Sequence, residues 1–151
     1  MIHVDKEGQW FHKGAPIIHG ELLALFYESI DVNDDEEYVI RFKDQVCVLD
    51  VEDTPFVIIR TDFVPRASDE GEDRFVLRLM GGIEEDLVPE SLFIGANHVL
   101  YCKIRGGKFR ARFSRASYYQ LAEYFREEPK TGRYFLPLND KQYYVQEDLL
   151  K

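Results

Sequence analysis

The stretch YCKIRGGKFRARFSR, residues 101–115, reads as a strand, a tight turn, a second strand and the start of a helix. The Gly-Gly pair in its middle is typical of a two-residue hairpin turn. Such a turn predicts the register, with Lys103 opposite Arg110 and Tyr101 opposite Arg112. Because side chains alternate between the two faces of a strand, the charges share one face and the apolar residues share the other. The stretch therefore predicts a half-buried antiparallel hairpin with a cationic outer face.

This hairpin is the basic part of an acidic chain. The formal net charge is -9, yet residues 91–122 hold six basic residues and no acid. Like charges opposite each other destabilise a sheet, so the cations need partners. Three partners stay open: the chain's own acids on a guarded sheet edge, a small anionic ligand that Arg side chains bind bidentately, and nucleic acid. The predicted ligand-binding residues are Tyr101, which could stack on a ring, and Lys103, Arg105, Lys108, Arg110, Arg112 and Arg115.

The rest of the chain predicts an α+β fold. Residues 19–30 and 115–127 have the apolar spacing of helices, whereas segments rich in Val, Ile, Phe and Tyr have the composition of strands. The predicted buried stripe is Leu22, Leu25, Phe26 and Ile30 in the first helix, and Tyr118, Leu121, Ala122 and Phe125 in the second.

A weak repeat appears when each residue is compared with the residue 96 positions later. The order of strand, helix and hairpin in 17–49 returns in 113–145 without a gap. This offset predicts two related halves, each an antiparallel sheet with one helix. We expect an N-terminal subdomain at 1–67, an acidic connector at 68–73 and a C-terminal subdomain at 74–151.

Composition narrows the class of protein. The 151 residues include two cysteines in neither a redox nor a zinc spacing, and the four histidines lack metal-ligand spacing. We expect neither a metal nor a cofactor. The N-terminus shows no signal peptide and no apolar run reaches transmembrane length, so a cytoplasmic protein without membrane contact is expected. The acidic surface argues against nucleic acid as a partner.

Two further groups of residues have competing interpretations. Trp10, beside the first turn, is either a core anchor or a stacking platform. Asp50, Glu52 and Asp53 either fix a turn or hold a cation and act as acid and base. We favour the core and the turn, with the Asp53 carboxylate capping the turn. Nothing in the sequence argues for an enzyme.

Two stretches together resemble a known bacterial family. GQWFHKGAPIIHGELLALFYESI (8–30) and VCVLDVEDTPFVI (46–58) resemble the opening of the family called domain of unknown function 1285, and VLYCKIRGGKFRARFSRASYYQL (99–121) resembles its second half. The piece VEDTPF, residues 51–56, is the most specific part. The hairpin is more basic than in the family, and the chain is shorter around residues 41–44.

The resemblance implies a duplicated α+β core whose C-terminal half is loosely like a pleckstrin-homology fold. It also implies a cleft between the halves for a nucleotide-like ligand, with Trp10, Glu52, Asp53 and Phe56 as additional cleft residues, and a role in signalling. It implies no established reaction.

Three functions remain as hypotheses. The first is a non-enzymatic regulatory protein that binds a small anionic, nucleotide-based ligand. The second is an interaction module that docks an acidic protein partner through the basic hairpin. The third is a hydrolase that uses the acids at 50–53. The oligomeric state stays open.

Overall fold

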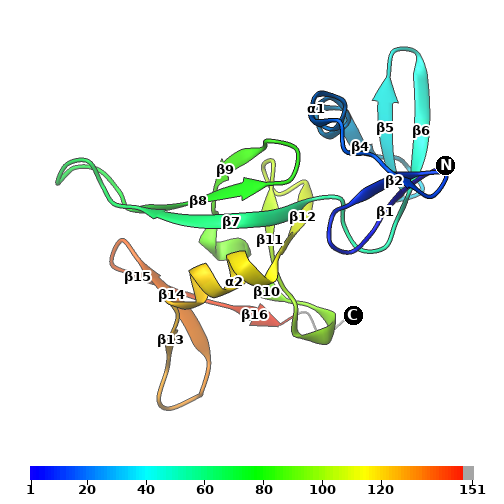
Figure 1. The fold of residues 1–151 in the computed structure, drawn as a ribbon. Coiled ribbons are helices and arrows are strands. Elements are labelled where there is room, and N and C mark those ends of the chain that lie inside the picture. Colours follow the sequence, from blue (N-terminus) through cyan, green and yellow to red (C-terminus); the bar gives the residue numbers. More distant parts are fainter. Residues whose placement is uncertain (148–151) are drawn as a thin grey trace. The chain divides into compact units, whose positions relative to one another are not determined.

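The computed structural model describes residues 1–147 and shows an α+β protein (Figure 1). Its two α-helices are α1 (Gly20–Glu28) and α2 (Arg115–Ala122). The chain forms two compact units, unit 1 from residues 1–55 and 80–83, and unit 2 from residues 56–79 and from 84 onward. Each unit is described by itself. Within the described residues, no helix has the length and apolar character needed to cross a membrane.

Unit 1 is built on a mixed sheet in the order β3-β2-β1-β6-β5-β4. Its neighbours pair antiparallel except β1 and β6, which run parallel. The helix α1 packs against β5. The strands are β1 (Ile2–Val4), β2 (Trp10–His12), β3 (Ala15–Pro16), β4 (Ile30–Val32), β5 (Tyr38–Phe42) and β6 (Gln45–Val51).

The core of unit 1 is centred on Tyr27, whose side chain is fully buried. Its hydroxyl accepts a hydrogen bond from Trp10 Nε1 (2.9 Å) and donates one to the Pro55 carbonyl (2.8 Å). The predicted buried stripe of this helix is therefore partly wrong, since Leu22 and Leu25 are 38% and 40% exposed. Residues 22–27 are all apolar or aromatic, so periodicity alone does not choose a face, and the two bonds of the Tyr27 hydroxyl do.

Unit 2 contains a larger mixed sheet in the order β16-β10-β11-β12-β7-β8-β9, and a small antiparallel sheet in the order β13-β14-β15. In the larger sheet β12 runs parallel to β7, and β10 runs parallel to β16. The strands are β7 (Val57–Val64), β8 (Arg74–Leu79), β9 (Glu84–Asp86), β10 (Phe93–Ile94), β11 (Leu100–Ile104), β12 (Phe109–Phe113), β13 (Arg126–Glu127), β14 (Tyr134–Leu138), β15 (Lys141–Tyr144) and β16 (Gln146–Glu147).

Helix α2 follows β12 directly and packs against β7 and β12. Ser114 caps it, because its Oγ accepts a hydrogen bond from the Ser117 backbone N–H (3.1 Å). The buried Ser117 hydroxyl donates to the Ile58 carbonyl of β7 (2.8 Å), and Leu121 is fully buried on the same side. These contacts fix the first turn of α2 against the sheet, which positions the side chains around it.

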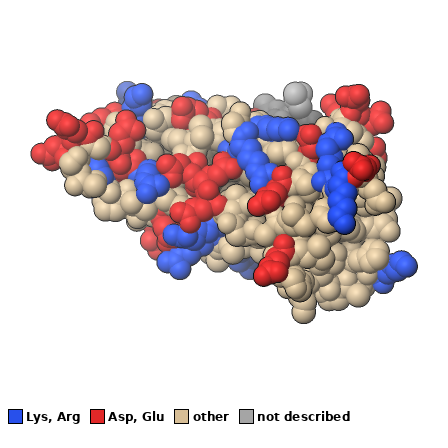
Figure 2. Space-filling view, turned by 90° about the horizontal axis from the view of Figure 1, so that it is seen from above, with Lys and Arg blue, Asp and Glu red and all other residues tan. Residues whose placement is uncertain are grey.

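The predicted acidic connector at 68–73 lies within a hairpin rather than between units. β7 and β8 pair antiparallel on either side of it, from Ile58–Leu79 to Val64–Arg74. Arg66 and Asp73 close the turn with an ion pair (3.3 Å). Figure 2 shows this end of the hairpin, at the far left as in Figure 1, as acidic side chains interspersed with basic ones. The composition of a connector and that of a long hairpin turn are alike, and the division between the units falls at 55–56 instead.

The predicted relation between the halves is confirmed. With an offset of 96, β5 (38–42) coincides with β14 (134–138), and β4 and β6 correspond to β13 and β15. The hairpin registers agree as well, since the pair Val39–Val48 corresponds to Phe135–Tyr144. The sheets are mixed rather than purely antiparallel, because short parallel pairs join strands distant in sequence. The likeness to a pleckstrin-homology fold stays a prediction.

Candidate functional site

The basic hairpin has the predicted register. β11 and β12 pair antiparallel, with Lys103 opposite Arg110 and Tyr101 opposite Arg112. The inner face is buried as expected and consists of Leu100, Cys102, Ile104, Phe109, Ala111 and Phe113. Burial raises the pKa of the Cys102 thiol well above its usual range, so this thiol stays protonated and unreactive.

Aromatic rings lie beside the cations of this hairpin. The Lys103 ammonium is 5.4 Å from the centre of the Phe93 ring, and the Arg110 guanidinium is 4.9 Å from that of Tyr101. Arg105 lies 5.1 Å from the Phe56 ring. Cation–π contacts of this kind stabilise a positive charge by about 0.5–1 kcal/mol at exposed sites. They help to explain how the sheet tolerates cations opposite cations.

Tyr101 has a packing role in this arrangement. Its side chain is 5% exposed, it stacks on Phe93 with ring centres 5.2 Å apart, and Arg110 covers it. A Cβ atom at Gly95 would come within 2.8 Å of the ring, so the glycine lets the backbone approach it closely. The predicted stacking of Tyr101 on a ligand ring is not supported by this burial.

A cationic hollow of about 280 Å³ opens at the start of α2. It brings together Arg112 at the end of β12, Arg115 in the first turn of α2, and His98 from the loop before β11. The backbone N–H of Arg112 donates to the Phe56 carbonyl of β7 (2.9 Å), which fixes the strand that carries this side chain. The remaining lining residues are Val99, Leu100, Phe113, Ser114, Tyr118 and Tyr119.

This hollow has the properties of an anion site. Unpaired N–H groups and the positive end of the helix dipole point out of the first turn of an α-helix, and guanidinium groups bind phosphate oxygens bidentately. Of the predicted ligand-binding residues, the structure brings Arg112 and Arg115 into it. Lys103, Arg105, Lys108 and Arg110 do not line it. Sequence reasoning missed His98, because no spacing motif links this residue to the helix.

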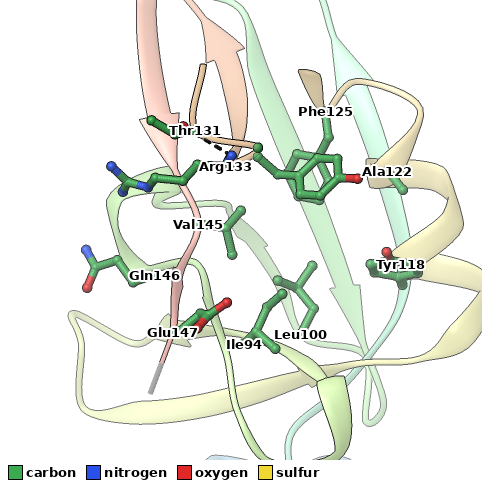
Figure 3. A pocket seen from close by; sticks show the side chains of 12 residues that line it. Ile94, Leu100, Tyr118, Ala122, Phe125, Thr131, Arg133, Val145, Gln146 and Glu147 are labelled. Atoms are coloured by element: carbon green, nitrogen blue, oxygen red, sulfur yellow. Dashed lines mark hydrogen bonds between the residues drawn. The ribbon is translucent and has the colours of Figure 1, made fainter. Parts of the chain in front are cut away.

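A larger hollow of about 850 Å³ adjoins the first, since Leu100 and Tyr118 line both hollows. Figure 3 shows Tyr118, Ala122 and Phe125 of the α2 region on one side, and Arg133, Gln146 and Glu147 on the other, with Ile94, Leu100 and Val145 between them. The half-buried Tyr118, Ala122 and Phe125 belong to the stripe that the sequence predicted as core. Their partial exposure results from this hollow.

The other predicted site residues lie elsewhere. Trp10 is a core residue of unit 1, stacked on Phe26 with ring centres 5.7 Å apart. Phe56 is fully buried in unit 2, 4.8 Å from the Phe109 ring centre. Glu52 and Asp53 lie in unit 1. That these residues share one cleft with the basic hairpin stays a prediction, as does the capping role of Asp53.

The acids near the end of β6 converge on a histidine. His3 Nδ1 is 2.8 Å from Asp50 Oδ2, and its Nε2 is 2.9 Å from Glu52 Oε2. Two carboxylate acceptors require two N–H donors, so the arrangement favours the imidazolium and raises the pKa of His3. The bonds tie β1 to β6. Among residues 1–147, no cluster of three or more His, Cys, Asp or Glu side chains has a geometry that could hold a metal ion.

The stability of unit 1 is therefore expected to fall as the pH rises. Because the folded-state pKa of His3 lies above 6.5, the bonds stabilise the fold fully below that value and are lost as the pH rises through the folded-state pKa. The urea midpoint, followed by the fluorescence of Trp10, the sole tryptophan, should decline over this range. In His3→Gln this part of the decline should disappear. An equal decline in both proteins would contradict the assignment.

Comparison with known proteins gives a structural answer only. No family model matches the sequence, and no curated protein matches it. A crystal structure of a DUF1285 family protein from Silicibacter pomeroyi DSS-3 matches with a TM-score of 0.74 and 17% identity, over 96% of this chain and 79% of that chain. The protein has the DUF1285 fold.

A second structure agrees. A DUF1285 family protein from Shewanella baltica OS155 matches with a TM-score of 0.63 and 20% identity, over 81% of this chain and 90% of that chain. The resemblance seen in the sequence is thereby confirmed at the level of the fold. A fold alone does not determine which ligand a protein binds, so the hollows of unit 2 are the features that bear on function.

Proposed function

We propose that the protein is a non-enzymatic regulatory module that binds a small anionic ligand, such as a nucleotide, at the cationic hollow of unit 2. The observation that carries the proposal is the convergence of Arg112, Arg115 and His98 on the first turn of α2. Each supplies N–H donors, and the positive end of the helix dipole lies beside them. A role in signalling, the cytoplasmic location and membership of the bacterial DUF1285 family are parts of the same proposal.

The remaining cations of the hairpin have a different role in this proposal. Arg105 and Lys108 flank the turn and do not line the hollow. Charges at this kind of position steer an anion toward its site, and added salt screens such an effect over about 10 Å at 0.1 M. Their contribution to binding should therefore fade with ionic strength, whereas that of Arg115 should largely persist.

Titration calorimetry with inorganic phosphate, pyrophosphate and a nucleoside triphosphate tests the proposal. We expect at least one of these anions to bind, and Arg115→Gln to weaken its binding at least tenfold, because an Arg–phosphate pair is worth about 1.5–3 kcal/mol. Lys130→Gln is the matched control, since it removes the same charge from an exposed residue that lines neither hollow.

Two outcomes would count against the proposal. One is an anion screen without binding, and an acidic peptide that then bound the hairpin would favour an interaction module instead. The other is equal weakening by Arg115→Gln and Lys130→Gln, which would reduce the effect to the net charge of the chain.

A further inference from the structure

The two hollows of unit 2 differ in their charge and share two lining residues. Leu100 of β11 and Tyr118 of α2 line both. Arg112, Arg115 and His98 line only the cationic hollow. A ligand that extended from one hollow into the other would therefore meet an excess of basic side chains at one end only.

Part of the larger hollow can take an apolar group. The side chains from β10, β11 and α2 and the residues before β13 and β16 are aliphatic or aromatic, whereas the segment before β14 and the strand β16 contribute Thr131, Gly132, Arg133, Gln146 and Glu147. Its volume of about 850 Å³ lies within the range of roughly 300–1,000 Å³ that is typical of small-molecule sites. The apolar and aromatic residues are Ile94, Leu100, Tyr118, Ala122, Phe125, Tyr134 and Val145.

The charged side chains of the two hollows determine how a bound molecule would be oriented. Among residues 1–147, one acid, Glu147, and one base, Arg133, line the larger hollow, and both lie on the side away from α2 (Figure 3). The Arg133 guanidinium lies 4.4 Å from the centre of the Tyr144 ring, which holds it beside that ring. The described residues that line the cationic hollow include, in contrast, three basic side chains and no acid. An anionic group is thus favoured at the start of α2. The larger hollow offers it no comparable excess of positive charge.

We propose that the ligand is an amphipathic phosphomonoester, whose phosphate binds at Arg112 and Arg115 and whose apolar body fills the larger hollow. This inference rests on the proposed function for its phosphate end and adds the chemical class of the rest of the molecule. Burial of the apolar body supplies affinity in proportion to the surface removed from water, while the phosphate supplies orientation.

Three soluble probes test the inference: inorganic phosphate, phenyl phosphate and glycerol 3-phosphate. Phenyl phosphate has an apolar body, and glycerol 3-phosphate has a polar body of similar size. We expect phenyl phosphate to bind roughly ten- to a hundredfold more tightly than either of the other two, given the apolar area of one ring.

Two variants separate the ends of the ligand. Ala122→Phe places a ring in the larger hollow, and Ala122 does not line the cationic one. It should abolish the advantage of phenyl phosphate and leave the affinity for inorganic phosphate unchanged, which also shows that the variant is folded. Arg115→Gln should weaken all three probes by the same factor. If Ala122→Phe does not fold, Thr131→Trp at an exposed position of the same hollow makes the same comparison.

The outcomes distinguish the two levels of the proposal. Equal affinities of the native protein for phenyl phosphate and inorganic phosphate would overturn the amphipathic ligand and leave the anion site intact. An advantage for phenyl phosphate that survived both hollow-filling variants would also overturn it. No binding of any probe, or no effect of Arg115→Gln, would instead overturn the proposed function on which the inference rests.

Discussion

Gly81→Ala is expected to lower the free energy of unfolding of unit 1 by about 2–5 kcal/mol. Two costs combine in this variant. Gly81 has φ = +84°, a left-handed conformation that costs a residue with a Cβ atom about 1–2 kcal/mol. The new Cβ would also lie 2.7 Å from Cε2 and 2.8 Å from Cγ of Tyr27, and overpacking of this kind costs about 1–3 kcal/mol.

The Tyr27 ring has little freedom to move away. It is fully buried, and its hydroxyl is bonded to Trp10 Nε1 and to the Pro55 carbonyl. A displaced ring would strain both bonds, and burial already raises the pKa of this hydroxyl to about 12, so it remains a neutral donor at neutral pH. The clash therefore has to be relieved by the backbone at 80–83 or by loss of these bonds.

Gly82→Ala is the matched control for this prediction. Gly82 has φ = +78°, yet a Cβ atom there would meet nothing within 4 Å. Gly82→Ala should lower the free energy of unfolding only by the cost of the left-handed backbone conformation, about 1–2 kcal/mol. Urea unfolding followed by Trp10 fluorescence gives both values, and their difference measures the contact with Tyr27. Equal costs for the two alanines would show that the close approach to the ring contributes nothing.

Phe56→Ala is expected to destabilise unit 2 by about 3–5 kcal/mol, the usual cost of removing a buried phenylalanine side chain. Phe56 is fully buried, packs 4.8 Å from the ring centre of Phe109 and lies beside the Arg105 guanidinium. Its loss would leave a cavity under the hairpin and remove the aromatic partner of one cation. Thermal or urea unfolding followed by far-UV circular dichroism measures the effect.

The corresponding control is Phe63→Ala, in which the same side chain is removed from a position that is 37% exposed. It should cost clearly less, because less apolar surface returns to water. Phe56→Leu, which keeps most of the buried volume, should retain the fold and the affinity for phosphate. A Phe56→Leu protein of native stability that no longer bound phosphate would make Phe56 a ligand-contacting residue, as the resemblance implied, rather than a core residue.

Local patterns predicted much of this fold. The Gly-Gly turn and alternation predicted the register of β11 and β12, because both are properties of adjacent residues. The offset of 96 placed β14 and β15 correctly. Two predictions were wrong because they depend on residues distant in the sequence. The buried face of α1 is determined by the hydrogen bonds of Tyr27 with Pro55 and Trp10. The division between the units at 55–56 depends on the pairing of β7 with β8.

The candidate site was predicted in part for the same reason. Arg112 and Arg115 were predicted as ligand-binding residues because they belong to the stretch of basic residues without an acid. His98 and the larger hollow were not predicted. The residues that line the two hollows come from segments between 94 and 147, and only the folded sheet brings these segments together. The aromatic partner Phe93 was missed likewise, as no pattern within the hairpin points to residues outside it, and Phe56 was named only through the family resemblance.

Unit 1 consists of two stretches of chain, and this has a consequence for its synthesis. Tyr27 leaves the ribosome before Gly81, which follows more than fifty residues later. During that interval the nascent core would lack one of its packing partners, and a fragment that ended at Pro55 would lack it permanently. Domains generally fold as units during synthesis. Cotranslational folding of unit 1 should therefore reach completion only after the segment 80–83 has emerged.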